Sequence, residues 1–490
     1  QPLGYQPVRG ELMQKVGNKP YISVNYTFDG LTPAGLPEDL CYKLNQYYEQ
    51  KLRQDKTAHD KIEFEIIFNT YDFMTDTRLK ELAEYGFDDV EISQLRNALF
   101  EIAKQTLEHY DEICEEDLRS LGQLTELRHE LRKHAPLAET NVMKLYSYID
   151  ELLDSIKDHG TPQFTRQARC AFMARSFCRT LVEKGYFTKQ EMDDFMLSIP
   201  TVASEFERDF DLYSHGKLSR DDFNHLYGHL RLGTYDIRSD SYRNIYFDVA
   251  SANLTGNNKV KQEAKSLDLE RLQVALDEAG IPVTPEKFIE FIKKATQNRE
   301  YFKFEFTKSL SLMLDVIVKL GEVMAIARED MSYLEIQDLL SYHSRDSYIQ
   351  TIETRRRFYH VNSYLVLPEV IFDVGDIDVI DIDEARPNFI TNKVVEAPIV
   401  NLDEDHDSDI TGKIVVLTKA DPGYDWIFAK DIAGFVTKYG GAASHMAIRC
   451  AEFGIPAAIG CGEKIYQRIH RMQIMCLDCE NGRITEKQSQ

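Results

Sequence analysis

The feature that most constrains this 490-residue chain is a helical spacing of apolar residues that extends from about Pro37 to about Ser347. One such stripe comprises Val142, Leu145, Ile149, Leu152 and Ile156. Steps of three and four residues bring apolar side chains onto one face of a helix, so most of this region is predicted to be packed helices. The alternating aromatic run from Asn298 to Phe306 is predicted to belong to their core.

The sequence pattern changes near Tyr359. From there on it contains short runs rich in β-branched residues, such as Lys413 to Leu417. After Gly412 the order reads strand, helix, strand, helix, strand, which is typical of an α/β unit with some parallel strands. The chain is therefore predicted to be a multidomain α plus α/β protein, in which a large mostly helical domain precedes a small α/β domain.

The boundaries follow from these changes in pattern and from the acidic, turn-rich stretch before Gly412. We expect an N-terminal extension from a missing upstream domain at residues 1–36, the helical domain at 37–372, an acidic linker region at 373–411 and the α/β domain at 412–490. Because the sequence starts without Met and without an apolar signal region, the chain is expected to be cut from a longer protein.

The charge balance narrows the range of partners. The chain has 58 Lys and Arg against 81 Asp and Glu, a formal net charge of −23. Nucleic acids and anionic membrane surfaces attract basic proteins, so neither is an expected partner. No apolar run is long enough for a transmembrane helix. Eight cysteines are too few for a disulfide scaffold, and without a secretory signal they are expected to be free thiols in the cytoplasm.

One short segment has the composition of a phosphate-handling site. Gly440 and Gly441 permit close backbone approach, and they precede Ser444 and His445 at the expected start of a helix. The free N–H groups and positive dipole end of that helix favour an anion, and a neutral histidine is a nucleophile near pH 7. The residues taken alone support a capping serine beside an incidental histidine equally well.

The longer pattern around this segment resembles the signature of the mobile phosphohistidine domain in the phosphoenolpyruvate-utilising enzymes, among them phosphoenolpyruvate synthase and rifampicin phosphotransferase. The matching positions are Thr437, Gly440, Gly441, Ser444, His445, Ala447, Ile448, Glu452, Gly454, Ile455, Pro456 and Ala457. Asp421–Trp426 is similar to the Thr-Pro-x-Trp region that precedes this signature. The chain departs from the signature at Ala451, where the family usually has Arg, and at Lys438, where an acidic residue is frequent. Arg449 stands two positions before Ala451, a rotation of about 200° on a helix, so it is not expected to replace that Arg.

The resemblance implies that His445 is transiently phosphorylated. The expected phosphate-binding residues are Thr437, Gly440, Gly441 and Ser444. The phosphate would come from ATP bound on an ATP-grasp domain of the same full-length protein, and a swivelling motion would carry it to a small-molecule acceptor in the helical domain. No cofactor or metal site is expected in this chain, since ATP and Mg²⁺ would bind the missing domain, and the fragment alone is expected to be inactive.

Two other interpretations remain open. One is a phosphoenolpyruvate synthase-like enzyme whose pyruvate-binding barrel lies elsewhere. The other is a non-catalytic binding or regulatory module that keeps the swivelling fold, which the Arg-to-Ala difference at position 451 favours.

The acceptor site is predicted from a looser resemblance. Leu226–Ile237 is similar to a Gly-His-Arg-Gly-Pro-Gly-Glu segment in the acceptor domain of rifampicin phosphotransferases. On this interpretation His229 is a base or ligand contact, and Arg231 and Arg238 bind an anionic group. The alternative, which the residues alone favour slightly, is a helix end held by hydrogen bonds from its His and Arg side chains.

Overall fold

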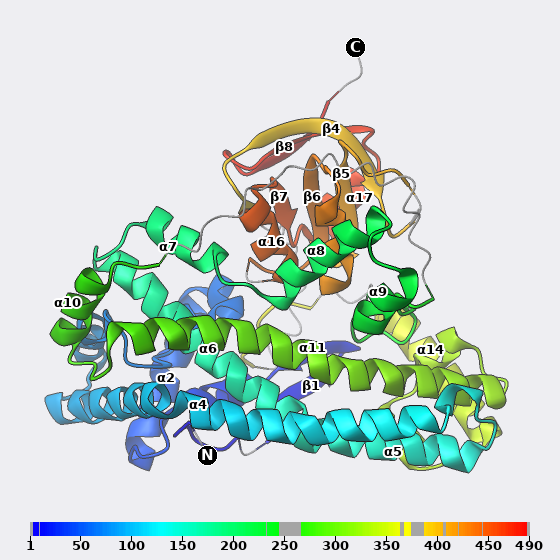
Figure 1. Ribbon diagram of the computed structural model, residues 1–490, viewed down its shortest axis with the longest axis horizontal. Helices are drawn as coiled ribbons and strands as arrows, with labels where there is room; N and C mark the ends of the chain where they lie inside the picture. The colour runs from blue at the N-terminus through cyan, green and yellow to red at the C-terminus, as the bar shows by residue number, and fades with distance from the viewer. Residues whose placement is uncertain are drawn as a thin grey trace.

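The computed structural model describes residues 3–8, 10–231, 233–244, 266–362, 367–373, 387–404, 408–419, 421–442 and 444–487. Figure 1 shows a layer of long helices with a C-terminal sheet domain packed against one side, next to α8 (Val202–Ser214) and α9 (Arg220–Tyr227). Among the described helices, none combines the length and apolar character that crossing a membrane requires. The predicted α plus α/β class is confirmed.

Four long helices build the helical region: α4 (Asp89–Lys133), α5 (Val142–His159), α6 (Thr161–Glu183) and α11 (Pro285–Val323). Its other helical elements are α1 (Val24–Leu31), α2 (Glu38–Gln54), η1 (Lys56–Asp60), η2 (Ile62–Ile66), α3 (Thr75–Arg78), η3 (Leu79–Tyr85), η4 (Pro136–Ala138), α7 (Lys189–Leu197), α10 (Leu269–Ala279), α12 (Arg328–Met331), α13 (Ile336–Leu340) and α14 (Arg345–Asn362). Helix α11 packs on α4, α5 and α6, which lie side by side in Figure 1. Local sequence sets its start, because Thr284 caps the helix and Pro285 occupies the first turn.

The long helices of the helical region enclose two separate apolar cores, and a smaller aromatic cluster around Phe206 joins α8 and α9. The first joins α2, the beginning of α4, α6 and the beginning of α11, and the second joins the end of α4, α5 and the rest of α11. Along α11, Ala295 is the last residue of the first core and Phe302 the first of the second, and no residue of 296–301 is buried. The predicted core role of the aromatic run is confirmed for Phe302 and Phe306.

The N-terminal residues take part in the first core. Leu3, Tyr5 and Phe28 are buried there, and the hairpin of β1 (Met13–Val16) and β2 (Lys19–Ile22) lies between them in sequence. The described part of residues 1–36 therefore packs as a portion of the helical region, in contrast to the separate extension that its position in the chain suggested.

The C-terminal domain is built on a seven-stranded mixed sheet with the order β3-β7-β6-β5-β4-β8-β9. Its strands are β3 (Asn388–Ile390), β4 (Val394–Asn401), β5 (Ile414–Lys419), β6 (Gly434–Tyr439), β7 (Ala457–Ile459), β8 (Ile474–Asp478) and β9 (Arg483–Glu486). Strands β4, β5, β6 and β7 are parallel, as predicted for part of this domain, and the other pairings are antiparallel.

The sheet is covered on both faces. Along β5, Val415 and Leu417 face a core with η6 (Pro422–Ala429) and α16 (His445–Phe453), while Ile414 and Val416 face a core with α17 (Gly462–Ile469). This alternation follows from the two-residue period of a strand. It explains why β5 reads as a continuous apolar run, which is the signature of a strand buried on both faces.

Strands β3 and β4 lie within residues 373–411, where the sequence suggested an acidic linker. Strand β3 pairs with β7 and β4 pairs with β5, so the sheet of the C-terminal domain begins before Gly412. Strands β3 and β4 form because they hydrogen-bond to β7 and β5, although the stretch as a whole is acidic. Residues 374–386, the middle of the expected linker, lie outside the described residues.

Candidate functional site

The paired glycines follow β6 and form a tight loop against the end of β7. A Cβ atom on Gly460 would lie 2.4 Å from the carbonyl oxygen of Gly440, so only glycine permits this approach. The hydroxyl of Thr437 is buried and accepts a hydrogen bond of 3.2 Å from the Gly460 N–H. Thr437 therefore joins strand β6 to the loop after β7, and its predicted contact with phosphate remains a prediction.

Helix α16 begins directly at His445. Ser444 is its N-cap, and the serine hydroxyl accepts a hydrogen bond from the Ala447 N–H. The apolar side of the helix, with Met446 and Cys450, is buried against the sheet and orients the first turn. The imidazole of His445 thus stands at the end of the helix where unpaired N–H groups and the positive dipole favour an anion.

The nearest partner of His445 is the carboxylate of Asp425 in η6. Nε2 of His445 lies 2.6 Å from Oδ1 and 2.8 Å from Oδ2, and the two side chains are only 20% and 14% exposed. Burial lowers the pKa of His445, but the charge of Asp425 and its hydrogen bond outweigh burial, so the pKa is raised above 6.5. Because η6 and α16 belong to the same domain, both members of this pair lie within one domain.

Arg449 reaches the same carboxylate from one turn further along α16. Four residues separate it from His445, so both side chains lie on one face of the helix. Its Nε lies 3.9 Å from Oδ1 of Asp425, and its Nη1 donates to Glu452 at 2.7 Å. Ala451 is exposed on another face. Arg449 therefore does not occupy the place of the family's Arg, as expected, but contacts the residue that holds His445.

The same arginine joins the C-terminal domain to the helical region. Arg449 is buried and forms an ion pair with Glu207 of α8. Nearby, the Thr234 hydroxyl donates to Asp421 at 2.9 Å, and the Tyr242 hydroxyl donates to the carbonyl oxygen of Gly423. The contact is apolar as well, since Trp426 packs against the aromatic cluster around Phe206.

Two charged residues of α11 act on His445 across this contact. The negative charge of Glu300 raises the pKa of His445, and the positive charge of Lys303 lowers it, after the larger effects of burial and of Asp425. A Cβ atom on Gly441 would lie 2.4 Å from Oδ2 of Asp60, so the glycine loop also meets η1. The imidazole therefore faces α11 around Glu300 and Lys303, and the glycine loop faces η1.

Sequence reasoning found His445 but missed its surroundings. Asp425 lies within the Asp421–Trp426 stretch that carried the family resemblance, yet nothing in its spacing from His445 indicated a contact. Glu300 and Lys303 lie inside an aromatic run, and the core role of their neighbours concealed them. Arg449 was distinguished only as a displaced family residue.

The residues predicted for the acceptor site lie close in sequence but have different surroundings. His229 is buried, with its ring edge-on to Phe304 at 4.6 Å, and its Nε2 has no hydrogen-bond partner among the described residues. The guanidinium of Arg231 is enclosed by Ser311 and Asp315. Arg238 is held by Asp236 at 2.7 Å. Of the three, His229 is the one without a protein partner for its polar atom.

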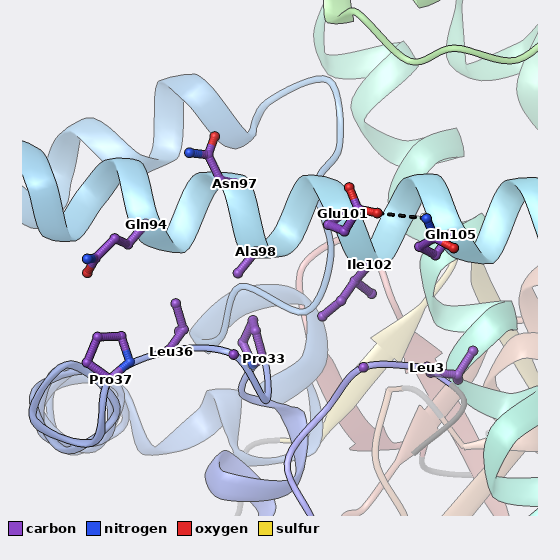
Figure 2. Close-up of a pocket in the computed structure, with 12 residues that line it drawn as sticks. Leu3, Pro33, Leu36, Pro37, Gln94, Asn97, Ala98, Glu101, Ile102 and Gln105 are labelled. Carbon is purple, nitrogen blue, oxygen red and sulfur yellow. Dashed lines mark hydrogen bonds between the residues drawn. The ribbon is translucent and has the colours of Figure 1, made fainter.

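A separate cavity of about 660 Å³ lies in the helical region between the N-terminal segment and α4 (Figure 2). Leu3, Leu36 and Ile102 form part of its wall, and Glu101 and Gln105 are hydrogen-bonded to each other at 2.7 Å along α4. No residue of the C-terminal domain lines this cavity, so it is not part of the His445 site.

Comparisons with known proteins agree with this geometry. Residues 410–482 match the family model described as PEP-utilising enzyme, mobile domain. Rifampicin phosphotransferase of Bacillus subtilis (strain 168) is 28% identical over 222 residues, which cover 41% of this chain and 24% of that protein. Rifampicin phosphotransferase of Bacillus cereus is 26% identical over 212 residues, 39% of this chain and 24% of that protein. The chain thus matches about a quarter of the length of each relative.

Proposed function

We propose that His445 carries a phosphoryl group from ATP to a small-molecule acceptor in the helical region, because residues 410–482 match the mobile domain of PEP-utilising enzymes. The observation that carries the proposal is the His445–Asp425 pair at the start of α16, docked against α11. A nucleophile at a helix N-terminus, next to a domain contact, is what a carrier of phosphate requires.

In the first step, ATP would bind an ATP-grasp domain of the full-length protein, together with Mg²⁺. The described residues contain no group of three or more His, Cys, Asp and Glu able to hold a metal ion, so the metal would come with the nucleotide. The neutral imidazole of His445 attacks phosphorus, the N–P bond forms, and the bond to the nucleotide breaks. The free N–H groups at the start of α16 then stabilise the phosphate.

In the second step, the domain docks as seen here and an acceptor hydroxyl attacks the phosphohistidine. The N–P bond breaks, the O–P bond forms, and the proton lost by the hydroxyl ends on the released imidazole. Asp425 stabilises that imidazolium, which makes His445 a better leaving group. Lys303 supplies positive charge on the acceptor side, where charge on the transferred group must be neutralised.

The test is phosphorylation of the full-length protein with ATP, with the acid-labile phosphate trapped at alkaline pH and located by mass spectrometry. We expect His445→Ala to lose the label completely. His470→Ala is the matched control, because His470 is a histidine at the end of α17 in the same domain, bound to Glu404, and should keep the label. A His445→Ala protein that is labelled as strongly as the wild type would exclude the proposal.

The competing interpretations predict different results in the same assay. A non-catalytic module would acquire no acid-labile phosphate with any nucleotide. A phosphoenolpyruvate synthase-like enzyme would transfer the label from His445 to pyruvate once a pyruvate-binding barrel is supplied. The relatives that match here are named for phosphotransfer to rifampicin, which favours an acceptor that is itself bound by the helical region.

A further inference from the structure

A cluster of positive charge surrounds His229, in a chain whose net charge is −23. His229 packs edge-on against Phe304 of α11, and Lys308 lies over the same ring at 4.5 Å from its centre. Phe304 therefore holds an imidazole and an ammonium group close together. Burial first, and then the charges of Lys308, Arg128, Arg132 and Arg243, lower the pKa of His229 well below 6.5, so its imidazole is neutral at pH 7.

Three arginines complete this cluster from two other directions. Arg128 of α4 is buried and donates to Ser309 and Glu305 of α11, both within one turn of Lys308. Arg132 follows Arg128 by one turn on the same face of α4. Arg243 is brought beside this segment by its backbone N–H, which donates to the carbonyl oxygen of Gly228 at 3.2 Å. We call His229, Arg128, Arg132, Arg243 and Lys308 the His229 cluster.

The negative charge within reach does not balance these cations. Glu305 pairs with both Arg128 and Lys308, and Asp315 is already paired with Arg231. Arg132 has neither an ion pair nor a hydrogen bond to its guanidinium among the described residues, although the group is half-buried. Among the described residues, these four cations therefore share the carboxylate of Glu305 and the charge of Asp315, which also acts on Arg132. This excess of positive charge costs free energy unless an anion binds between the cations.

The position of the His229 cluster relates it to His445. Glu300, Phe304 and Lys308 follow one another at intervals of four residues, so they form one stripe along α11. His445 faces the Glu300 end and His229 the Lys308 end. Eight residues of helix separate the two ends, a rise of about 12 Å. The stripe spans a distance that suits a small organic molecule.

We propose that the His229 cluster binds the oxyanion group, carboxylate or phosphate, of the phosphoryl acceptor and so directs the acceptor's hydroxyl towards His445. This inference rests on the proposed function. Arg132 has the planar fork that pairs bidentately with an oxyanion, and the unpaired Nε2 of His229 supplies a further hydrogen bond. The acceptor is therefore an anionic hydroxy compound rather than a neutral one.

The test is calorimetric titration of the chain with inorganic phosphate and, separately, with acetate, at low ionic strength and pH 7.5. If only phosphate binds, the acceptor carries a phosphate group. If only acetate binds, the acceptor carries a carboxylate. We expect saturable binding that Arg132→Gln weakens at least tenfold and Lys308→Met weakens as well. Lys133→Gln is the matched control, since Lys133 is the next residue on α4, exposed and paired only with Glu130 among the described residues.

Two outcomes would overturn the inference: no saturable binding of either anion, or equal binding by Arg132→Gln and the wild type. Circular dichroism and thermal unfolding of each variant would separate loss of the site from loss of the fold. The same titration with His445→Ala measures anion binding in a variant that cannot be phosphorylated at His445, so it tests the anion site independently of the proposed function. If the chain binds the anion but His445 is never phosphorylated, the anion site is supported and the proposed function is excluded.

Discussion

At the scale of single residues, the protonation of His445 is controlled by Asp425. Burial alone would favour the neutral imidazole, and the carboxylate at 2.6 Å reverses that preference. The neutral form is the nucleophile and the protonated form is the better leaving group. For the proposed phosphate carrier, a pKa raised above 6.5 would therefore assist the release of phosphate at the cost of some reactivity towards ATP.

Replacing Asp425 by Asn should lower the pKa of His445 below its wild-type value, because burial then acts without the opposing charge. The pH dependence of His445 phosphorylation should accordingly shift to lower pH. Both effects can be measured, by NMR titration of the imidazole and by labelling rates across pH. Asp431→Asn, at an exposed carboxylate of the same domain, should change neither. An unchanged titration of His445 in Asp425→Asn would contradict this account of the pair.

The same pair links stability to pH. A histidine whose pKa is raised on folding stabilises the folded state fully below its unfolded pKa of about 6.5, and this contribution disappears as the pH rises through the folded pKa. The difference in unfolding free energy between the wild type and Asp425→Asn should therefore shrink as the pH rises through that window.

At this scale the sequence indicates the proposed nucleophile, His445, but not the residues around it. Ser444 and His445 are recognisable because capping and helix initiation depend on neighbours in the chain. Asp425 and Glu300 reach His445 only through the packing of η6 and α11, which no local pattern encodes. Arg231, predicted as a ligand contact, is fully enclosed by Ser311 and Asp315 on a distant segment of α11.

At the scale of elements, an ion pair between Arg449 and Glu207 joins α16 to α8. Arg449 is only 8% exposed and bridges Glu207 of the helical region to the carboxylate that holds His445. The domain therefore docks through the residue that also organises its own site. This arrangement couples the position of the domain to the surroundings of the imidazole.

Glu207→Gln should weaken docking by about 2 kcal/mol, roughly thirtyfold in the docking equilibrium, because a buried guanidinium loses its partner across the contact. Hydrogen exchange followed by mass spectrometry should show faster exchange in α8 and η6, with β5 unaffected. The exchanged pair Glu207→Arg with Arg449→Glu should recover part of the protection. Identical exchange in Glu207→Gln and the wild type would mean that other contacts carry the docking.

The elements themselves are mostly predictable, since the 3.6-residue period of α5 and the apolar run of β5 identify each type. The sheet was underestimated at β3 and β4. Strand β3 has only three residues and β4 contains a glutamate and a proline, and both become strands through pairing with β7, β5 and β8. A partner distant in sequence decided their structure.

At the scale of the whole molecule, each part has its own core. The second core of the helical region includes Leu320, and the sheet domain packs Leu417 beneath α16. The contact between the two parts is smaller and contains several polar pairs. Interfaces of this kind let domains unfold separately.

Scanning calorimetry should therefore resolve more than one transition in this chain. Leu320→Ala should lower the transition of the helical region, and Leu417→Ala that of the sheet domain, each by about 2–5 kcal/mol of unfolding free energy. Neither variant should shift the other transition by a comparable amount. A single transition that both variants lower equally would show that the chain unfolds as one cooperative unit.

The relative placement of the two parts is what the sequence could least provide. Composition and periodicity separate a helical region from a sheet domain, and the glycine loop marks the face that bears the histidine. Only the structure brings Gly441 against Asp60 and Thr234 to Asp421, contacts between segments at least 187 residues apart.

The six residues of α11 between its two cores, 296–301, have a consequence for the history of the protein. None of them belongs to either core, so replacing the side chains that make no contact across the fold should cost little folding free energy. Such side chains on this turn can therefore be exchanged while both cores stay fixed. Substitutions on this turn can therefore change which acceptor is bound without first destabilising the folded protein.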